Sequence, residues 1–254
     1  MTFVRKHSAA VSVVLSVTGG FLLWEMVSRF IIRNPLFLVP PSGIASRFTE
    51  MWGDGEIQHH VYVSGVEAAS GFVLAAFAGV AIGLAVGANA RLRVAVSPWI
   101  SGLYATPIVA LAPLVILWFG LGLMSKTVVV FSMAIFPVLI NTQAGIESTE
   151  DKLIETARAF GASKRQIFQK IYLPSAVPFI VAGLRLAVGR SLVGVVVAEL
   201  FGSRAGLGFL IMGASQTFDM GALFVAVLIL ALAGVLSTEA IKLLERRIAP
   251  WRWA

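Results

Sequence analysis

Long, uninterrupted runs of apolar residues dominate the chain. A helix of about 20 residues, rising 1.5 Å per residue, crosses the roughly 30 Å hydrocarbon core of a bilayer. We therefore predict membrane spans at residues 11–30, 65–87, 96–118, 127–142, 177–200 and 222–244. Strands of a membrane barrel would alternate polar and apolar residues over about ten positions, whereas residues 193–200 are almost continuously apolar. The expected fold is all-α: a polytopic membrane protein with about six transmembrane helices in one domain, residues 1–254.

Two segments between the predicted spans carry polar patterning. Residues 31–64 contain Pro40-Pro41 and the helix-start signal Ser42, which predict a short helix on the outer surface. Residues 143–175 form the longest loop on the other side and predict a helical cytoplasmic element. The first apolar run follows basic residues like a signal peptide, but Trp24, Glu25 and Arg29 replace the small residues of a cleavage site. We therefore expect an uncleaved span.

Composition excludes an ordinary soluble domain. The chain is 58% hydrophobic and 13% charged, with a mean hydropathy of +0.89, so the surplus of apolar residues must face lipid. It has no cysteine and three histidines, which excludes disulfides and thiolate metal sites and leaves little scope for a metal centre. We expect no cofactor. A net charge of +7 would suggest nucleic acid for a soluble protein, but here the position of the charges matters more, and no nucleic-acid partner is expected.

The basic residues are distributed unequally between the two sides. Cytoplasmic loops retain Lys and Arg, and with the N-terminus inside, 13 basic residues fall on that side: Arg5, Lys6, Arg91, Arg93, Lys152, Arg158, Lys164, Arg165, Lys170, Lys242, Arg246, Arg247 and Arg252. The opposite side holds 5: Arg29, Arg33, Arg47, Lys126 and Arg204. Both termini are therefore predicted to be cytoplasmic.

Small residues and prolines mark two of the spans. In the second span every fourth residue is small: Gly71, Ala75, Gly79, Gly83 and Gly87. Such a stripe lets two helix backbones approach closely, and packing between spans is the main interpretation. Pro107 and Pro113 remove backbone donors from the third span and should kink it. The kink either belongs to a pathway or gate or is simple curvature.

Ionisable residues inside the spans normally face other helices or water. Glu25 and Arg29 can pair one turn apart, while Glu199 and Glu239 are expected close enough to an interface to reach headgroups or solvent. Arg185 and Arg190 lie in the inner half of the fifth span. They either extend toward the cytoplasm or line a path for a solute. The candidate pathway residues are Pro107, Pro113, Arg185 and Arg190.

Signatures of enzymes are missing from the sequence. There is no Gly-Lys pair and so no phosphate-binding P-loop, which means that any ATP must be handled by another subunit. The sequence Gly206-Leu207-Gly208 lacks a third glycine and is expected to be an outer turn. An intramembrane serine protease needs a histidine at membrane depth, but all three histidines (His7, His59 and His60) lie outside the predicted spans.

The inner loop has the most informative pattern. Thr149 can cap a helix whose first turn holds Glu150 and Asp151, and this helix should run to Phe160. Gly161 ends it, because glycine adopts the left-handed conformation without steric cost. Ser163 starts a second short helix with Gln166 completing a capping box. The result is a helix-glycine-helix elbow.

The elbow resembles a known motif. Glu155-Thr156-Ala157, Gly161, Ile171 and Leu173-Pro174 match the spacing of the EAA loop in permease subunits of binding-protein-dependent ABC importers, departing from it only at Thr156. Further matches look like the nitrate, sulfonate, taurine and bicarbonate group of that superfamily: Pro107, Pro113-Leu114, Trp118-Phe119-Gly120, Asn141-Thr142, Gly183-Leu184-Arg185, Ala198-Glu199 and Gly206-Leu207-Gly208.

The resemblance implies a transporter subunit of a bacterial inner membrane rather than an enzyme. In that family the elbow (Glu155, Thr156, Ala157, Gly161, Ile171, Leu173 and Pro174) docks on a cytoplasmic ATPase present in two copies. A second permease copy completes the pathway, commonly as a homodimer, and an extracytoplasmic binding protein delivers the solute, which the subgroup suggests is a small anion. The solute itself is not readable from the sequence. The alternative is an ion-coupled secondary transporter, which would need an acidic residue at mid-membrane, and none is predicted there.

Overall fold

The computed structural model describes the backbone of residues 2–248 and the side chains of residues 11–247, so Arg252 and the side chains of Arg5, Lys6 and His7 lie outside the described part. Within it the chain is built of helices and turns, without strands. The elements are α1 (Thr2–Met26), η1 (Val27–Ile32), α2 (Pro41–Gly53), α3 (Glu56–Ala88), α4 (Ala90–Ala105), α5 (Ile108–Phe119), α6 (Leu123–Glu147), α7 (Asp151–Ala159), α8 (Lys164–Ile167), η2 (Phe168–Tyr172), α9 (Leu173–Gly202), α10 (Leu207–Thr217) and α11 (Met220–Ile248).

Five helices in the described part are long and apolar enough to cross a membrane, and the bent pair α4 and α5 can make a sixth span. The expected all-α membrane fold is therefore confirmed. The candidate spans are Val11–Ile32, Glu56–Ala88, Leu123–Glu147, Lys164–Gly202 and Met220–Arg247. Two of the predicted spans belong to helices that begin well before the apolar run. Helix α3, which contains the second predicted span, begins at Glu56, and α9, which contains the fifth, continues a helical run that begins at Lys164.

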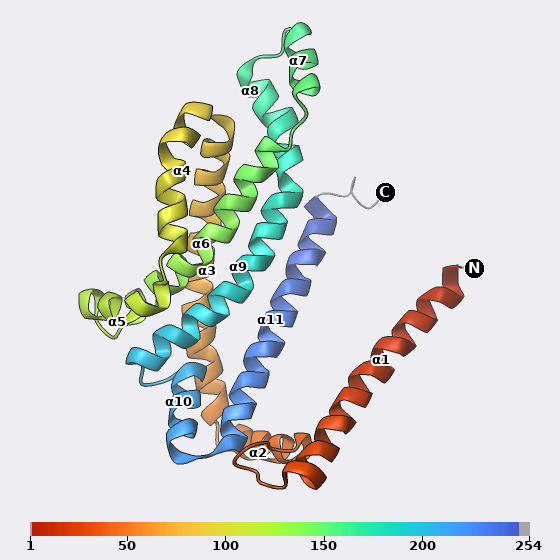
Figure 1. The fold of residues 1–254 in the computed structure, drawn as a ribbon, viewed down its shortest axis with the longest axis vertical. Helices are drawn as coiled ribbons and strands as arrows, with labels where there is room; N and C mark the ends of the chain where they lie inside the picture. The colour runs from red at the N-terminus through yellow and green to blue at the C-terminus, as the bar shows by residue number, and fades with distance from the viewer. Residues whose placement is uncertain (1, 249–254) are drawn as a thin grey trace.

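Helix α6 lies at the centre of the bundle, between α3 and α9 (Figure 1). The small-residue stripe of α3 faces it. A Cβ added at Gly71 would lie 2.5 Å from Val130 Cβ, and one at Gly83 would lie 2.6 Å from Thr142 Cβ. On the other side of α6, a Cβ added at Gly183 of α9 would lie 2.9 Å from the carbonyl oxygen of Pro137. The predicted role of the stripe in helix packing is confirmed, and dispersion between close backbones holds these three helices together.

The third predicted span is broken rather than gently kinked. Helices α4 and α5 meet at an angle of 91° across Thr106 and Pro107. Proline cannot donate to a continuing helix and disfavours helical geometry in the residue before it, and Thr106 accordingly has an extended backbone. Pro113, by contrast, lies inside α5 without a break. Only the first proline therefore shapes the chain path.

The bundle has two distinct ends (Figure 1). The short helices α7 and α8 project from one end, and α2 and α10 lie at the other. Helix α1 diverges from the bundle, and only 6% of the residues in its apolar window are buried within the chain. Helix α9 runs the length of the bundle and joins the projecting elbow to the end that carries α10.

Candidate coupling elbow and translocation surface

The elbow is formed by α7, the turn at Gly161 and α8. Gly161 has φ +79°, and Ser163 and Gln166 form the predicted capping box, with Gln166 N donating to Ser163 Oγ at 3.3 Å and Ser163 N donating to Gln166 Oε1 at 2.8 Å. The reciprocal bonds satisfy two amides that the helix start would leave unpaired. Both local predictions are confirmed, and the elbow has a defined shape.

The predicted cap at Thr149 is wrong. Helix α7 begins one residue later than expected, with Glu150 in the capping position and no side-chain cap bond. The Thr149 hydroxyl oxygen is buried without a hydrogen-bond partner. Thr149 instead belongs to the turn that ends α6, where its amide donates to the carbonyl oxygen of Ile146 at 3.2 Å.

Three of the seven motif residues of the elbow line a shallow hollow. Glu155, Thr156 and Gly161 are exposed, while Ala157, Ile171, Leu173 and Pro174 are half-buried. The hollow has a volume of about 250 Å³ and is lined by both arms of the elbow, including Ala157, Gly161 and Ile171. Phe160 at its rim is 88% exposed. Phe160 and the hollow thus form an exposed, partly apolar surface at the projecting end.

A second hollow lies at the break between α4 and α5. It has a volume of about 300 Å³ and is lined by residues of α4, α5, α6 and α9: Tyr104, Thr106, Pro107, Ile108, Val109, Ser132, Met133, Phe136 and Arg190. The rings of Tyr104 and Phe136 form one wall, with centroids 5.7 Å apart. The break thus brings Pro107 next to Arg190, the one charged residue of this lining.

The other two candidate pathway residues lie elsewhere. Arg185 forms an ion pair with Glu245 of α11, whose side chain is 1% exposed. This pair joins α9 to α11, so Arg185 neither lines the hollow nor extends freely toward the cytoplasm. Pro113 is absent from the lining of the hollow. Of the four residues named from the sequence, the structure brings together Pro107 and Arg190.

Glu199 is buried, not close to headgroups or solvent as its position in the sequence suggested. Its side chain lies between three helices and is 1% exposed. Oε1 accepts a hydrogen bond from Ser64 of α3 at 2.6 Å, and Oε2 accepts one from the backbone amide of Gly208 in α10 at 2.5 Å. Hydrogen bonds to both oxygens offset part of the cost of burying the carboxylate. Hydropathy along one helix could not reveal these partners.

The start of α10 is held by side chains from other helices. Gly206 N donates to His60 Nδ1 at 2.9 Å and Leu207 N to Ser64 Oγ at 2.7 Å, while Gly208 N reaches Glu199. Three successive amides that have no partner within α10 are thereby satisfied. Gly206 has φ +115°, and a Cβ there would collide with the Glu199 carboxylate. The predicted turn at residues 206–208 is therefore also the beginning of a helix.

Two further charged groups are buried beside this turn. Lys126 of α6 is 2% exposed, and its Nζ donates to the carbonyl oxygens of Leu121 and, at 2.7 Å, of Gly202 at the end of α9. Glu67 of α3 is 7% exposed, and its Oε2 has no hydrogen-bond partner. We refer to these residues together as the α9–α10 cluster: His60, Ser64, Glu67, Lys126 and Glu199.

The side chains in the described part of the chain form no group that could hold a metal ion.

A family model described as "Binding-protein-dependent transport system inner membrane component" matches residues 71–250, most of the chain. The chain belongs to this family. It is thus a permease subunit of an ABC-type importer and a multi-pass protein of the inner membrane.

Known relatives of the permease agree with its fold and with the predicted subgroup. It is 36% identical over 230 residues to the putative aliphatic sulfonates transport permease protein SsuC of Bacillus subtilis, an alignment that covers 91% of this chain and 83% of that protein. It is 33% identical over 231 residues to the formylaminopyrimidine transport permease protein ThiX of Halalkalibacterium halodurans, covering 91% and 92%. A solved structure of the MetNI methionine ABC transporter matches the fold with a TM-score of 0.59 at 23% identity, covering 76% of this chain and 96% of that one.

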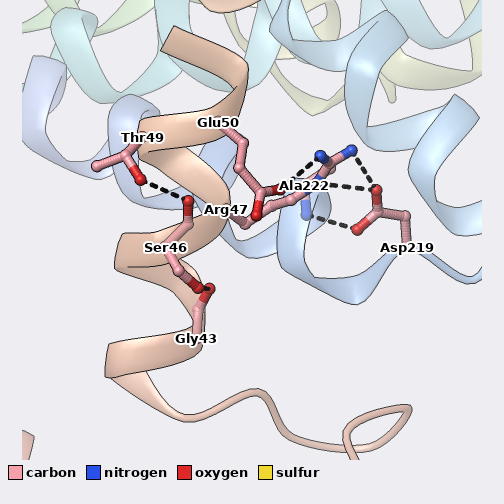
Figure 2. Close-up of polar contacts among 7 residues, drawn as sticks. All are labelled: Gly43, Ser46, Arg47, Thr49, Glu50, Asp219 and Ala222. Carbon is pink, nitrogen blue, oxygen red and sulfur yellow. Dashed lines mark hydrogen bonds and ion pairs between the residues drawn. The ribbon is translucent and has the colours of Figure 1, made fainter. Parts of the chain in front are cut away.

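At the end opposite the elbow, the permease fixes α2 to the start of α11 (Figure 2). Arg47 Nη2 donates to Asp219 Oδ2 at 2.8 Å, and Asp219 Oδ1 accepts from the amide of Ala222 at 3.0 Å, so one carboxylate caps α11 and binds α2. Partial burial lowers the pKa of Arg47, but hydrogen bonds to Glu50 and Asp219 outweigh it, and the net pKa is raised. The predicted pair Glu25 and Arg29 is also present, at 2.5 Å. These contacts hold the surface helix in a fixed position.

Proposed function

We propose that this permease forms half of the translocation pathway of an importer for a small anionic solute and that its elbow docks on a cytoplasmic ATPase. The observation that carries the proposal is the elbow itself: a shaped, projecting pair of short helices with an apolar ring 88% exposed at Phe160. The ring and the hollow beside it offer an apolar contact site to a partner. The family to which the chain belongs supplies the class of partner.

The assembly that follows has five parts. Two ATPase copies take one elbow each, a second copy of this permease faces the first, and a binding protein delivers the solute from outside. With the elbow in the cytoplasm, both termini lie on the cytoplasmic side, as the basic residues suggest. Arg190 is exposed in the single chain, and a second copy opposite it would enclose the hollow.

The chemistry of the hollow supports an anion. Arg190 has five donors in a planar fork that fits carboxylate or sulfonate oxygens. The aromatic wall formed by Tyr104 and Phe136 can contact a short apolar tail. The name of the SsuC relative, which concerns aliphatic sulfonates, is consistent with such a solute, whereas the name of ThiX concerns a formylaminopyrimidine. We choose an anion as the proposed solute because the Arg190 guanidinium lines the hollow.

The docking surface can be tested by the substitution Gly161→Val. Gly161 has φ +79° and no atom within 4 Å of an added Cβ, so within the permease the change costs only backbone strain of about 1 kcal/mol or more. The added side chain points into the space that the ATPase would occupy. We expect the ATPase to be lost when the permease is purified, with membrane insertion unchanged.

A matched control exists at the other end of the molecule. Gly55 has φ +77° and equally open surroundings, so Gly55→Val introduces the same strain away from the elbow. This variant should retain the ATPase. Glu155→Lys should weaken docking independently, by reversing an exposed charge on α7. Normal co-purification of the ATPase with both Gly161→Val and Glu155→Lys would contradict the proposal.

The pathway can be tested at Arg190. Arg190→Gln removes the charge from the hollow, and loss of one charge-assisted contact of about 1.4 kcal/mol or more would slow uptake of an anionic solute about tenfold. Arg190→Lys should retain part of the activity. Uptake into proteoliposomes that contain the complete importer measures both. Unchanged uptake by Arg190→Gln would remove this residue from the pathway while leaving the docking proposal intact.

A further inference from the structure

Helix α9 connects the elbow with the α9–α10 cluster by an unbroken helical run. The run extends from Lys164 to Gly202, 39 residues through α8, η2 and α9, which corresponds to a rod of about 58 Å. Its first residues belong to the elbow, and its last carbonyl, at Gly202, accepts the Lys126 hydrogen bond. The elbow and the cluster are therefore joined by one helical run.

The cluster contains one acceptor more than it uses. Glu199 accepts hydrogen bonds on both oxygens and lies in contact with the Glu67 carboxyl group, whose Oε2 is buried and accepts no hydrogen bond. Glu67 lies three residues after Ser64, on the same face of α3. Lys126 nevertheless bonds to two backbone carbonyls, those of Leu121 and Gly202, instead of a carboxylate. Glu67 and Lys126 line the same hollow, so an alternative pairing of Lys126 with Glu67 is available.

The cluster also has space in which to rearrange. A hollow of about 330 Å³ lies beside it, lined by Glu67, Lys126 and Gly202 together with Ser203 and Arg204 of the turn. The contact between α3 and α6 leaves no such room, because a Cβ at Gly71, Gly79 or Gly83 would overlap α6. Movement of the turn into the hollow does not require the α3–α6 contact to separate.

We propose that the α9–α10 cluster is a two-position latch at the end of α9 remote from the elbow. In the present position Glu199 and Ser64 hold the start of α10, and Lys126 holds the end of α9. When α9 is displaced, Gly202 moves away and Lys126 transfers its hydrogen bonds to the Glu67 carboxylate, which frees the α9–α10 turn. The inference rests on the proposed function, because the ATPase supplies the displacement. Two discrete hydrogen-bond arrangements of the same groups are what a switching element requires.

The test measures accessibility of the turn in the assembled importer. Because the chain has no cysteine, Ser203→Cys introduces a single thiol, and its rate of labelling by a membrane-impermeant maleimide is measured without nucleotide and with ATP and vanadate. We expect a severalfold difference between the two states. Ser46→Cys, on the exposed face of α2, is the control and should be labelled at the same rate in both.

Two variants then separate a latch from a purely structural joint. Glu67→Gln keeps the size of the side chain but removes the charge that would receive Lys126, so the severalfold difference at Ser203→Cys should disappear while the ATPase still co-purifies. In the second variant, Ser64→Cys with Leu207→Cys, the bond of 2.7 Å between Ser64 Oγ and Leu207 N keeps the Cα atoms within reach of a disulfide. Formation of that bond, verified by mass spectrometry, should abolish stimulation of the ATPase by the loaded binding protein, and reduction should restore it.

The results that overturn the latch differ from those that overturn docking. If wild-type labelling at Ser203→Cys is the same with and without nucleotide, or if Glu67→Gln retains the full difference, the cluster is a fixed joint. Normal stimulation of the ATPase by the stapled protein would lead to the same conclusion. If instead the ATPase fails to co-purify with the wild-type permease, the proposed function itself is wrong.

Discussion

The helical run from Lys164 to Gly202 has two ends that differ in how completely their side chains are buried. At the elbow, Phe160 is exposed, and a Cβ at Gly161 would meet nothing within 4 Å. At the α9–α10 cluster, Glu199 and Lys126 are buried, and a Cβ at Gly206 would collide with a carboxylate. The same kind of residue, a glycine with positive φ, is free at one end and enclosed at the other. In our proposal the first end meets another protein, whereas the second is enclosed by the chain's own side chains.

Alanine at the two glycines should produce the largest contrast in stability. Gly206→Ala adds a Cβ at φ +115° against the Glu199 carboxylate, and strain with overpacking should lower the free energy of unfolding by about 3 kcal/mol or more. Gly161→Ala should cost only about 1 kcal/mol, the strain of the left-handed backbone. Equilibrium unfolding in mixed micelles measures both. Equal losses for the two variants would mean that the two ends do not differ as described.

Removing the buried lysine tests the cluster end alone. Lys126→Met keeps most of the side-chain volume but leaves the carbonyls of Leu121 and Gly202 without their donor. Unsatisfied buried groups cost about 1–3 kcal/mol each, and we expect a loss of about 2 kcal/mol in the same unfolding assay. The exposed Lys152 of α7 provides the comparison, because Lys152→Met should change stability by less than about 0.5 kcal/mol. A neutral result at Lys126 would show that water replaces its hydrogen bonds.

The smallest change in stability is expected at the apolar surface of the elbow. Phe160→Ala and Leu153→Ala remove side chains that are 88% and 50% exposed, so each should alter the unfolding free energy of the isolated permease by less than about 0.5 kcal/mol. The amount of ATPase retained on purification should nevertheless fall. A substantial loss of stability without any loss of the ATPase would show that these side chains serve the fold of the elbow rather than docking.

Local sequence patterns predicted the elbow better than the cluster. Gly161 and the capping box of Ser163 with Gln166 depend on residues within a few positions, and the structure confirms both. The prediction for Thr149 was wrong although its pattern is also local, because Thr149 takes part in the turn that ends α6. The helix-packing stripe was readable too, because its period of four is a property of one helix.

The cluster was not readable because its parts are far apart in the sequence. Glu199 and its partner Ser64 are separated by 135 positions, and hydropathy along either helix assigns each residue to an interface. The break at Pro107 was partly foreseen, but its angle of 91° depends on how α5 packs on α6 and α9. The two arginines looked equivalent along α9, and only the position of Glu245 distinguishes Arg185 from Arg190.

The separation between Ser64 and Glu199 also affects how this protein is made. Helix α3 is synthesised with its glycine face and the Glu67 carboxylate long before α9 exists. At about 5–20 residues per second, the interval for 135 residues is roughly 7–27 s. During that time Ser64 and Glu67 have no α9 or α10 to enclose them, although α6, which covers the small-residue stripe of α3, is made earlier. The insertion machinery must therefore shelter α3 until α6 and α9 arrive, and biogenesis, as well as transport, depends on where Glu67 and Ser64 lie in the chain.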